Sequence, residues 1–319
     1  MQLLSLIKDA KSILIVCHKK PDGDTLGAGF ALWQLCRALS KPADIAADTS
    51  HPPPYGFIPD FDALNRPAQK KYDLVFAVDC AEAARMGKFA DYAQSAVCVN
   101  IDHHKTNDYF GKHNYVIPEL SSTCEALYGL LKKEGVFAAG AFSPETVKKI
   151  AYSLFVGLST DTGHFMHSSV TAQTFITAAE LAATGIDFHR IGQSLYRANS
   201  VQKTKLIAAA IQSMRFFRND EICVLTVSLA DIEKTGCLSS DTEGLIDFGM
   251  NISAVQVAVL ITQQNEKLYK VSFRSKGLDV SNVAGVFGGG GHVRASGCIV
   301  SGYYEDVVDK VVKAVTDFM

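Results

Sequence analysis

The chain has 319 residues, 48% of them hydrophobic and 20% charged, and a formal net charge of -2 at pH 7. This composition excludes an intrinsically disordered protein, and the near-neutral charge argues against binding of long duplex nucleic acid, which depends on neutralising many phosphates. We expect a cytoplasmic protein, because residues 1–10 lack the apolar core of a signal peptide and no apolar run reaches the roughly 18–20 residues that span a bilayer.

The first part of the chain alternates short apolar runs with amphipathic stretches. The runs at residues 12–16, 73–78 and 96–101 lack polar alternation, which is typical of strands buried on both faces, and 44–47 is a further short strand. Helical spacing predicts a helix from about Thr25 to Leu39. This rhythm predicts an α/β fold with a doubly wound, mainly parallel sheet, in which ligands gather at the carboxyl ends of the strands.

Ionisable residues follow three of these strands directly. They are His18, Asp79 and the run Asp102-His103-His104. Ionisable groups near a core need partners, and the carboxyl ends of parallel strands meet at one edge of a sheet. We therefore predict that these side chains lie close together.

The middle of the chain, from Ser121 onward, is predicted to be helical. Ser143 and Pro144 are typical of a helix start, with the serine as N-cap and the proline at the first helical position. Asp161 follows the apolar part of this helix and is a further candidate ligand. The predicted helices span Thr123–Lys133, Pro144–Leu158, Thr171–Thr184, Asp187–Tyr196 and Val201–Met214.

After Met214 the pattern changes to strands, which predicts a second, smaller α/β domain. We predict a first domain over residues 1–190, a linker helix over 191–215 and a second domain over 216–319. The predicted elements of the second domain are strands at Ile222–Val227, Ala254–Ile261 and Leu268–Phe273, and helices at Asp241–Phe248 and Tyr304–Phe318.

Carboxylates and imidazoles dominate the candidate ligands, a set that suits Mn²⁺, Mg²⁺ or Fe²⁺ better than a structural zinc ion. Two ions about 3.5–4 Å apart would need a bridging carboxylate. Singly, each residue also has an ordinary structural explanation, since Asp22-Gly23 is a common turn and Asp24 can cap a helix. The candidates are His18 with Asp22 and Asp24, then Asp79, then Asp102-His103-His104, then Asp161.

In this order the clusters resemble the motifs of the DHH phosphoesterase family. The matching runs are His18-x-x-Pro21-Asp22-x-Asp24, Asp79, Asp102-His103-His104 and Asp161-Thr162-Gly163. The tail Gly288-Gly289-Gly290-Gly291-His292, followed by Ala295-Ser296-Gly297, resembles the DHH-associated substrate-binding domain. Each motif alone is weak, but five in order, over residues 18 to 297, are specific.

The resemblance implies a site for two Mn²⁺ ions, with Mg²⁺, Fe²⁺ or Co²⁺ as alternatives, and Asp79 as the bridging ligand. Asp102 would orient ligands, and His104 would contact the scissile phosphate or the leaving group. The implied ligands are His18, Asp22 and Asp79 for one ion, and Asp24, Asp79, His103 and Asp161 for the other.

The second domain carries the residue types that bind phosphate and bases. Consecutive glycines expose backbone N–H groups to phosphate oxygens. Arg274 suits bidentate phosphate contact, Ser275 can add a hydroxyl, and His292 can stack on a base or bind phosphate. The expected substrate contacts are Arg274, Ser275, Gly289, Gly290, Gly291 and His292.

The resemblance implies phosphoester hydrolysis by a hydroxide that bridges two metal ions. A chain of this length with both domains is similar to the group within the family that degrades RNAs of a few nucleotides (nanoRNA) and 3′-phosphoadenosine 5′-phosphate. Cleavage of cyclic di-AMP is one alternative, and a non-catalytic nucleotide-binding or sensing module is another. The expected partners are short RNA or nucleotides rather than long duplexes or a membrane, and a homodimer stays open.

Overall fold

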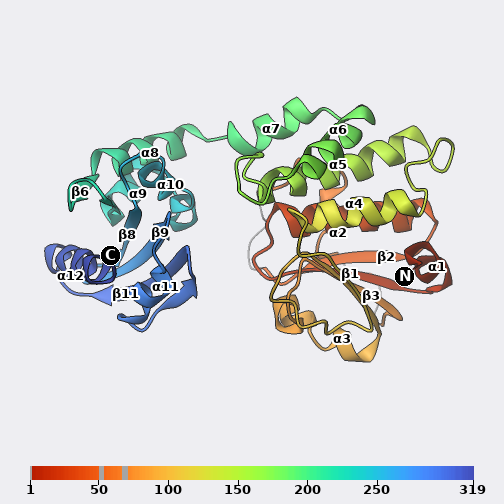
Figure 1. The fold of residues 1–319 in the computed structure, drawn as a ribbon, viewed down its shortest axis with the longest axis horizontal. Coiled ribbons are helices and arrows are strands. Elements are labelled where there is room, and N and C mark those ends of the chain that lie inside the picture. The colour runs from red at the N-terminus through yellow and green to blue at the C-terminus, as the bar shows by residue number, and fades with distance from the viewer. Residues whose placement is uncertain (1, 50–53, 67–70) are drawn as a thin grey trace. The chain divides into compact units, whose positions relative to one another are not determined.

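The computed structural model describes residues 2–49, 54–66 and 71–319 (Figure 1). Within these residues, no helix combines the length and the apolar character that a crossing of a membrane requires.

The chain divides into two compact units, Met1–Ala198 and Asn199–Met319. The boundary between them lies inside the range 191–215, for which a linker helix is predicted. That range contains the end of α7 (Phe188–Tyr196) and all of α8 (Val201–Gln212), so it is not one continuous helix.

The sheet of the first unit is parallel throughout, in the order β2-β1-β3-β4-β5. The chain moves outward in one direction after β1 and in the other direction from β3 onward, so the topological switch point lies between these two strands. In open α/β sheets, ligands bind outside the carboxyl ends of the strands at such a point. The strands are β1 (Ile13–Cys17), β2 (Ala43–Ala47), β3 (Leu74–Val78), β4 (Val97–Asp102) and β5 (His113–Val116).

Helices cover both faces of this sheet, which confirms the predicted doubly wound α/β fold (Figure 1). The larger core packs one face against the long helices, and α6 and α7 pack in turn against α5. The smaller core packs the other face against η2 (Ala83–Phe89) and α3 (Tyr92–Ser95). The helices over the first face are α1 (Leu3–Asp9), α2 (Gly23–Ala38), α4 (Thr123–Lys133) and α5 (Pro144–Asp161), and α6 spans Ala172–Ala183.

Glycines allow α2 and α5 to approach each other closely. A Cβ at Gly27 would lie 2.4 Å from the carbonyl oxygen of Ser153. A Cβ at Gly157 would lie 2.2 Å from Cys124 Sγ and 2.7 Å from Asp24 Oδ1. The packing of these helices therefore determines where Asp24, a predicted ligand, is held.

The second unit is a mixed sheet in the order β10-β11-β9-β8-β7-β6, in which only β7 and β8 pair in parallel. This confirms the predicted second, smaller α/β domain. The strands are β6 (Arg215–Phe217), β7 (Ile222–Val227), β8 (Val257–Asn265), β9 (Leu268–Ser275), β10 (Gly290–His292) and β11 (Ala295–Ser301).

Helices lie on both faces of this sheet as well. One core contains side chains of α8, α9 (Leu229–Thr235) and α10 (Asp247–Met250), and the other contains side chains of α11 (Val280–Gly285) and α12 (Tyr304–Phe318). The helix predicted at Asp241–Phe248 is wrong. A short 3-10 turn, η3 (Ser239–Thr242), is separated from α10 by Gly244, whose φ of 84° ends the helical path.

Candidate active site

The predicted ligands of the first unit all lie at the carboxyl end of its sheet or at adjacent helix ends. His18 follows β1, Asp79 follows β3, and Asp102 is the last residue of β4. Asp22 is the N-cap of α2, where its side chain accepts hydrogen bonds from the N–H groups of Asp24 and Thr25. Figure 1 shows β1 and β3 side by side in this sheet. Asp24 lies in the first turn of α2, and Asp161 is the last residue of α5.

The ligand atoms of these residues form three groups, each within 4.8 Å, that could hold a metal ion. Asp79 belongs to two of the groups and His103 to two. Asp79 follows β3, which borders the sheet switch point, and His103 follows the neighbouring strand β4. The groups are His18 with Asp22 and Asp79, Asp24 with His103 and Asp161, and Asp79 with His103 and His104.

The two oxygens of Asp79 face different imidazoles. Asp79 Oδ2 lies 3.4 Å from His18 Nε2, and Asp79 Oδ1 lies 3.9 Å from His103 Nε2. His18 Nε2 is also 3.5 Å from Asp22 Oδ2, and His103 Nε2 is 3.1 Å from Asp161 Oδ2. This arrangement gives each imidazole Nε2 its own carboxylate and one shared carboxylate.

Both of these imidazoles are oriented through their other ring nitrogen. His18 Nδ1 lies 2.9 Å from the carbonyl oxygen of Lys19, and His103 Nδ1 lies 3.3 Å from that of Leu120. A neutral imidazole whose Nδ1–H donates to a backbone carbonyl presents the lone pair of Nε2, which is how metal-binding histidines are usually held.

The site attracts positive charge strongly. Burial alone lowers the pKa of His18, but its hydrogen bonds to Asp22 and Asp79 and their charges outweigh burial and raise this pKa to about 10. Burial would also lower the pKa of His103. The hydrogen bond to Asp161 and the charge of Asp24 outweigh burial, so the pKa of His103 is raised to about 10.

The pKa of Asp24 also reflects the excess of negative charge in the site. It is completely buried, and burial together with the charges of Asp79 and Asp161 raises the pKa of Asp24 well above its usual value. A divalent cation would supply the charge that holds these carboxyl groups in the ionised form. The oxygen-rich donor set with two imidazoles therefore fits Mn²⁺ or Mg²⁺.

His104 is held differently from the other two histidines. Its Nδ1 lies 2.7 Å from Asp102 Oδ1 and 3.6 Å from Asp79 Oδ1. The hydrogen bond to Asp102 raises the pKa of His104 above its usual value. Since Nδ1 is already engaged with Asp102, the nitrogen that remains for an external group is Nε2.

The predicted substrate residues lie together in the second unit. His292 pairs with Ala295 across β10 and β11, and Ala295 pairs with Arg274 across β11 and β9. Residues directly opposite one another on neighbouring strands project from the same face, so Arg274 and His292 share a face. Both are exposed, as are the glycines Gly289, Gly290 and Gly291.

Two of these residues also have structural roles. The hydroxyl of Ser275 is buried and donates to the carbonyl oxygen of Leu278, so it does not present a free donor. A Cβ at Gly289 would lie 2.3 Å from the carbonyl oxygen of Gly297, so this glycine is required for the approach of the chain to β11.

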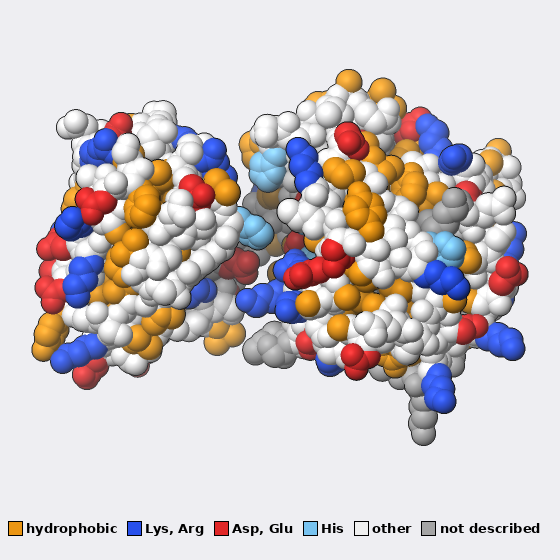
Figure 2. Space-filling model, turned by 60° about the horizontal axis from the view of Figure 1, so that its bottom comes forward, with side chains coloured by type: hydrophobic (Ala, Val, Ile, Leu, Met, Phe, Trp, Pro, Cys, Tyr) orange, Lys and Arg blue, Asp and Glu red, His pale blue; other side chains and the backbone are white. Residues whose placement is uncertain are grey.

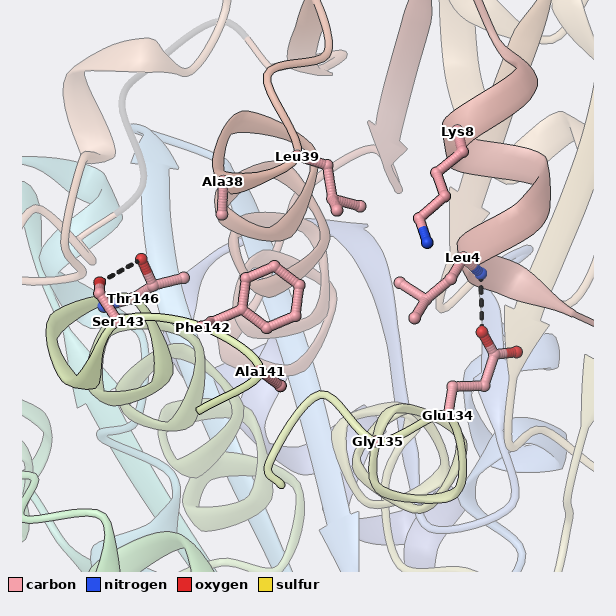
Figure 3. Close-up of a pocket in the computed structure, with 10 residues that line it drawn as sticks. All are labelled: Leu4, Lys8, Ala38, Leu39, Glu134, Gly135, Ala141, Phe142, Ser143 and Thr146. Carbon is pink, nitrogen blue, oxygen red and sulfur yellow. Dashed lines mark hydrogen bonds between the residues drawn. The ribbon is translucent and has the colours of Figure 1, made fainter. Parts of the chain in front are cut away.

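A cavity of about 620 Å³ in the first unit contains none of the predicted site residues (Figure 3). Its charged lining residues are Lys8 and Glu134. The Glu134 carboxylate accepts hydrogen bonds from the N–H groups of Leu3 at 2.5 Å and Leu4 at 2.7 Å, so it stabilises the first turn of α1.

Residues outside the sequence motifs also contact the site. The N–H groups of Thr123 and Cys124 donate to Asp24, and the side chain of Asn107 donates to Asp102 Oδ2 at 2.6 Å. In the sequence, Thr123 is visible only as the start of an expected helix. Asn107 lies in a polar loop and carries no signal of its own.

Family models match both parts of the chain. Residues 12–158 match the model of the DHH family, N-terminal domain, and residues 219–319 match that of the DHHA1 domain. The chain is 29% identical over 311 residues to a bifunctional oligoribonuclease and PAP phosphatase NrnA of Thermus thermophilus, covering 96% of this chain and 89% of that protein. It is 26% identical over 312 residues to the protein of that name in Bacillus subtilis, covering 97% and 95%.

A solved structure shares the fold. An exopolyphosphatase-related protein from Bacteroides fragilis aligns with a TM-score of 0.87 at 25% identity, covering 99% of this chain and 94% of that chain. The two family models include the stretch from His18 to His104 and the stretch from Arg274 to His292. The chain therefore belongs to the DHH family of phosphoesterase hydrolases, with a DHH domain followed by a DHHA1 domain.

Proposed function

We propose that this chain hydrolyses short oligoribonucleotides, including dinucleotides such as pApA, and 3′-phosphoadenosine 5′-phosphate. The observation that carries the proposal is the gathering of carboxylates and imidazoles around Asp79 at the switch point of a parallel sheet. The names of the relatives in Thermus thermophilus and Bacillus subtilis support the choice of substrates.

The proposed cofactors are two divalent cations, Mn²⁺ in the first place and Mg²⁺, Fe²⁺ or Co²⁺ as alternatives. Such cations lower the pKa of bound water toward neutrality and offset the charge that develops on phosphoryl oxygens. His18, Asp22 and Asp79 would hold one cation, and Asp24, Asp79, His103 and Asp161 the other.

His104 and Asp102 would act on the substrate side of the site. Asp102 is fully buried and engages Nδ1 of His104 at 2.7 Å, which fixes the ring and leaves Nε2 for a phosphoryl oxygen or the leaving group. A positioned imidazole that donates a hydrogen bond to the reacting phosphate stabilises the charge of the transition state.

Arg274 and His292 would bind the substrate from the face that they share in the second unit. A guanidinium group binds phosphate oxygens in a bidentate manner, and an imidazole can stack on a base. On the view in Figure 2, acidic and basic side chains are interspersed on each unit. This pattern suits a short substrate better than a long polyanion.

A substrate panel tests the proposal. Purified protein with Mn²⁺ is incubated with pApA, 3′-phosphoadenosine 5′-phosphate, cyclic di-AMP and RNAs of 2 to 20 nucleotides, and the products are separated by chromatography. We expect the fastest turnover with dinucleotides and little with 20-mers. Preferred cleavage of cyclic di-AMP would favour that alternative, and binding of dinucleotide without cleavage over hours would favour a sensing module.

Asp79→Asn tests the bridging role. We expect loss of Mn²⁺-dependent dinucleotide hydrolysis, because an amide offers one ligand oxygen where a carboxylate offers two. Asp73→Asn is the matched control, since Asp73 precedes the other end of β3 and accepts hydrogen bonds from the N–H groups of Lys11 and Ser12. An Asp79→Asn variant that keeps more than about half the wild-type rate would refute the assignment.

A further inference from the structure

The first turn of α4 contacts two of the proposed ligands, which come from other parts of the chain. Thr123 N–H donates to Asp24 Oδ2 at 2.7 Å, and Cys124 N–H donates to Asp24 Oδ1 at 2.9 Å. The hydroxyl of Thr123 donates to Asp79 Oδ1 at 2.9 Å. Thr123 is completely buried, so bulk water does not compete for these hydrogen bonds. One residue therefore joins two buried carboxylates.

The orientation of the Asp79 carboxylate matters because its oxygens face different imidazoles. Oδ2 faces His18 Nε2 at 3.4 Å, and Oδ1 faces His104 Nδ1 at 3.6 Å and His103 Nε2 at 3.9 Å. Rotation about the terminal torsion of an aspartate is soft, so the side chain alone does not hold this orientation. Among the described residues, the Thr123 hydroxyl is the one hydrogen-bond donor to this carboxylate other than the imidazoles.

The backbone that carries Thr123 is itself anchored. The Ser122 hydroxyl caps α4 by accepting a hydrogen bond from Glu125 N–H at 3.0 Å. The buried Glu125 carboxylate accepts hydrogen bonds from Ser121 N–H at 2.9 Å and from its hydroxyl at 2.5 Å. Thr123 is β-branched, which restricts its own side-chain torsion. Its hydroxyl is therefore presented from a fixed point.

We propose that Thr123 is a positioning residue of the metal site, whose hydroxyl fixes the rotation of the Asp79 carboxylate so that Oδ2 is held toward His18 and Oδ1 toward His103. This inference rests on the proposed metal-dependent function. The hydrogen bond leaves a ligand position on Oδ1, because a carboxylate oxygen has a second lone pair. Thr123 thus acts through Asp79, and it also links Asp79 to Asp24 across the site.

Two substitutions separate the hydroxyl from the rest of the side chain. Thr123→Val keeps the volume, the β-branch and the backbone N–H groups on Asp24 but removes the donor to Asp79. Thr123→Ser keeps the donor and removes a methyl group. Mn²⁺ affinity is measured by calorimetric titration of the full-length protein after chelation, and dinucleotide hydrolysis is measured in parallel.

We expect Thr123→Val to weaken Mn²⁺ binding at least about tenfold, as is typical for groups that orient metal ligands, and Thr123→Ser to stay within about threefold of wild type. Thr177→Val is the control, because the Thr177 side chain is equally buried and its hydroxyl accepts a hydrogen bond from Gln173 instead. Thr123→Ala replaces the valine variant if circular dichroism shows that the latter is unfolded.

The inference is overturned if Thr123→Val binds Mn²⁺ as wild type does, or if Thr123→Ser is as impaired as Thr123→Val. A wild-type protein that binds Mn²⁺ but cleaves no nucleotide would contradict the proposed function, while the affinity ratio would still decide the role of Thr123. A wild-type protein that binds no Mn²⁺ would contradict both.

Discussion

Asn107 donates a hydrogen bond to Asp102, the carboxylate that engages His104. Its Nδ2 donates to Asp102 Oδ2 at 2.6 Å and to Asn100 Oδ1 at 2.8 Å, and all three residues are buried. Asn107→Leu keeps the volume but leaves buried acceptors without a donor, which costs about 1–3 kcal/mol each. We expect a lower free energy of unfolding in urea and about a tenfold lower kcat for dinucleotides, with a smaller change in KM, because His104 loses its fixed orientation.

Asn114→Ala is the control for this prediction. Asn114 also hydrogen-bonds through its side chain, but it does so with the backbone of Gly111 in an exposed segment. We expect it to keep the wild-type kcat. An Asn107→Leu variant with wild-type kcat would show that the buried asparagine does not support His104.

Several candidate ligands can be found in the sequence because they follow an apolar run that is typical of a strand or a helix. His18 and Asp79 are visible in this way, and Asp161 is visible as the end of an apolar helix. Their hydrogen-bond partners are not visible. Thr123 is 44 positions from Asp79 and 99 from Asp24, and no local pattern reports a contact over such separations.

Regular elements are predictable where periodicity and caps agree. The predicted bounds of α4 and β7 match the structure, because Ser122 caps α4 and the residues of β7 are almost entirely buried. The sequence does not predict β5, His113–Val116. This edge strand is short and none of its residues is fully buried, so the segment lacks the apolar run that marks the inner strands. The prediction of a helix at Asp241–Phe248 is wrong because Gly244 has a positive φ, which interrupts a helix. The apolar spacing of the segment does not reveal this backbone conformation.

The close packing of α2 and α5 leads to a prediction about Gly157. Gly157→Ala would place a Cβ 2.7 Å from Asp24 Oδ1, so a helix or the carboxylate must move. We expect the metal-free protein to lose about 1–3 kcal/mol of stability in urea, as overpacked cores do, and to bind Mn²⁺ more weakly.

Gly129→Ala is the matched control within α4. Gly129 is exposed, and a Cβ there would meet no atom within 4 Å. We expect this variant to gain about 0.5–1 kcal/mol, because alanine loses less backbone entropy than glycine in a helix. Equal effects of the two substitutions would contradict the role of close packing at Gly157.

The division into two units follows from separate cores. The buried side chains of the first unit pack around a parallel sheet, and those of the second pack around a mixed sheet. The change of pattern after Met214 makes a second domain visible in the sequence. The position of the boundary is not visible, because it falls in the short connection between α7 and α8 and no strand marks it. All residues proposed to bind metal lie in the first unit.

Mn²⁺ should therefore stabilise the first unit selectively. The single tryptophan, Trp33, lies in α2, where its Nε1 donates to Ala43 carbonyl oxygen at 2.9 Å, so its fluorescence reports unfolding of that unit. Mn²⁺ at 100 times its Kd stabilises the first unit by about 2.7 kcal/mol for each occupied site, and one such site corresponds to a rise in Tm of about 5–10 °C for a unit of this size. Scanning calorimetry of the full-length protein should show a second component, from residues 199–319, whose Tm does not change with Mn²⁺.

Two outcomes would contradict this prediction. A joint shift in the Tm of both components would mean that the two units unfold together. An Asp79→Asn variant with the full shift in Tm would mean that Mn²⁺ binds elsewhere.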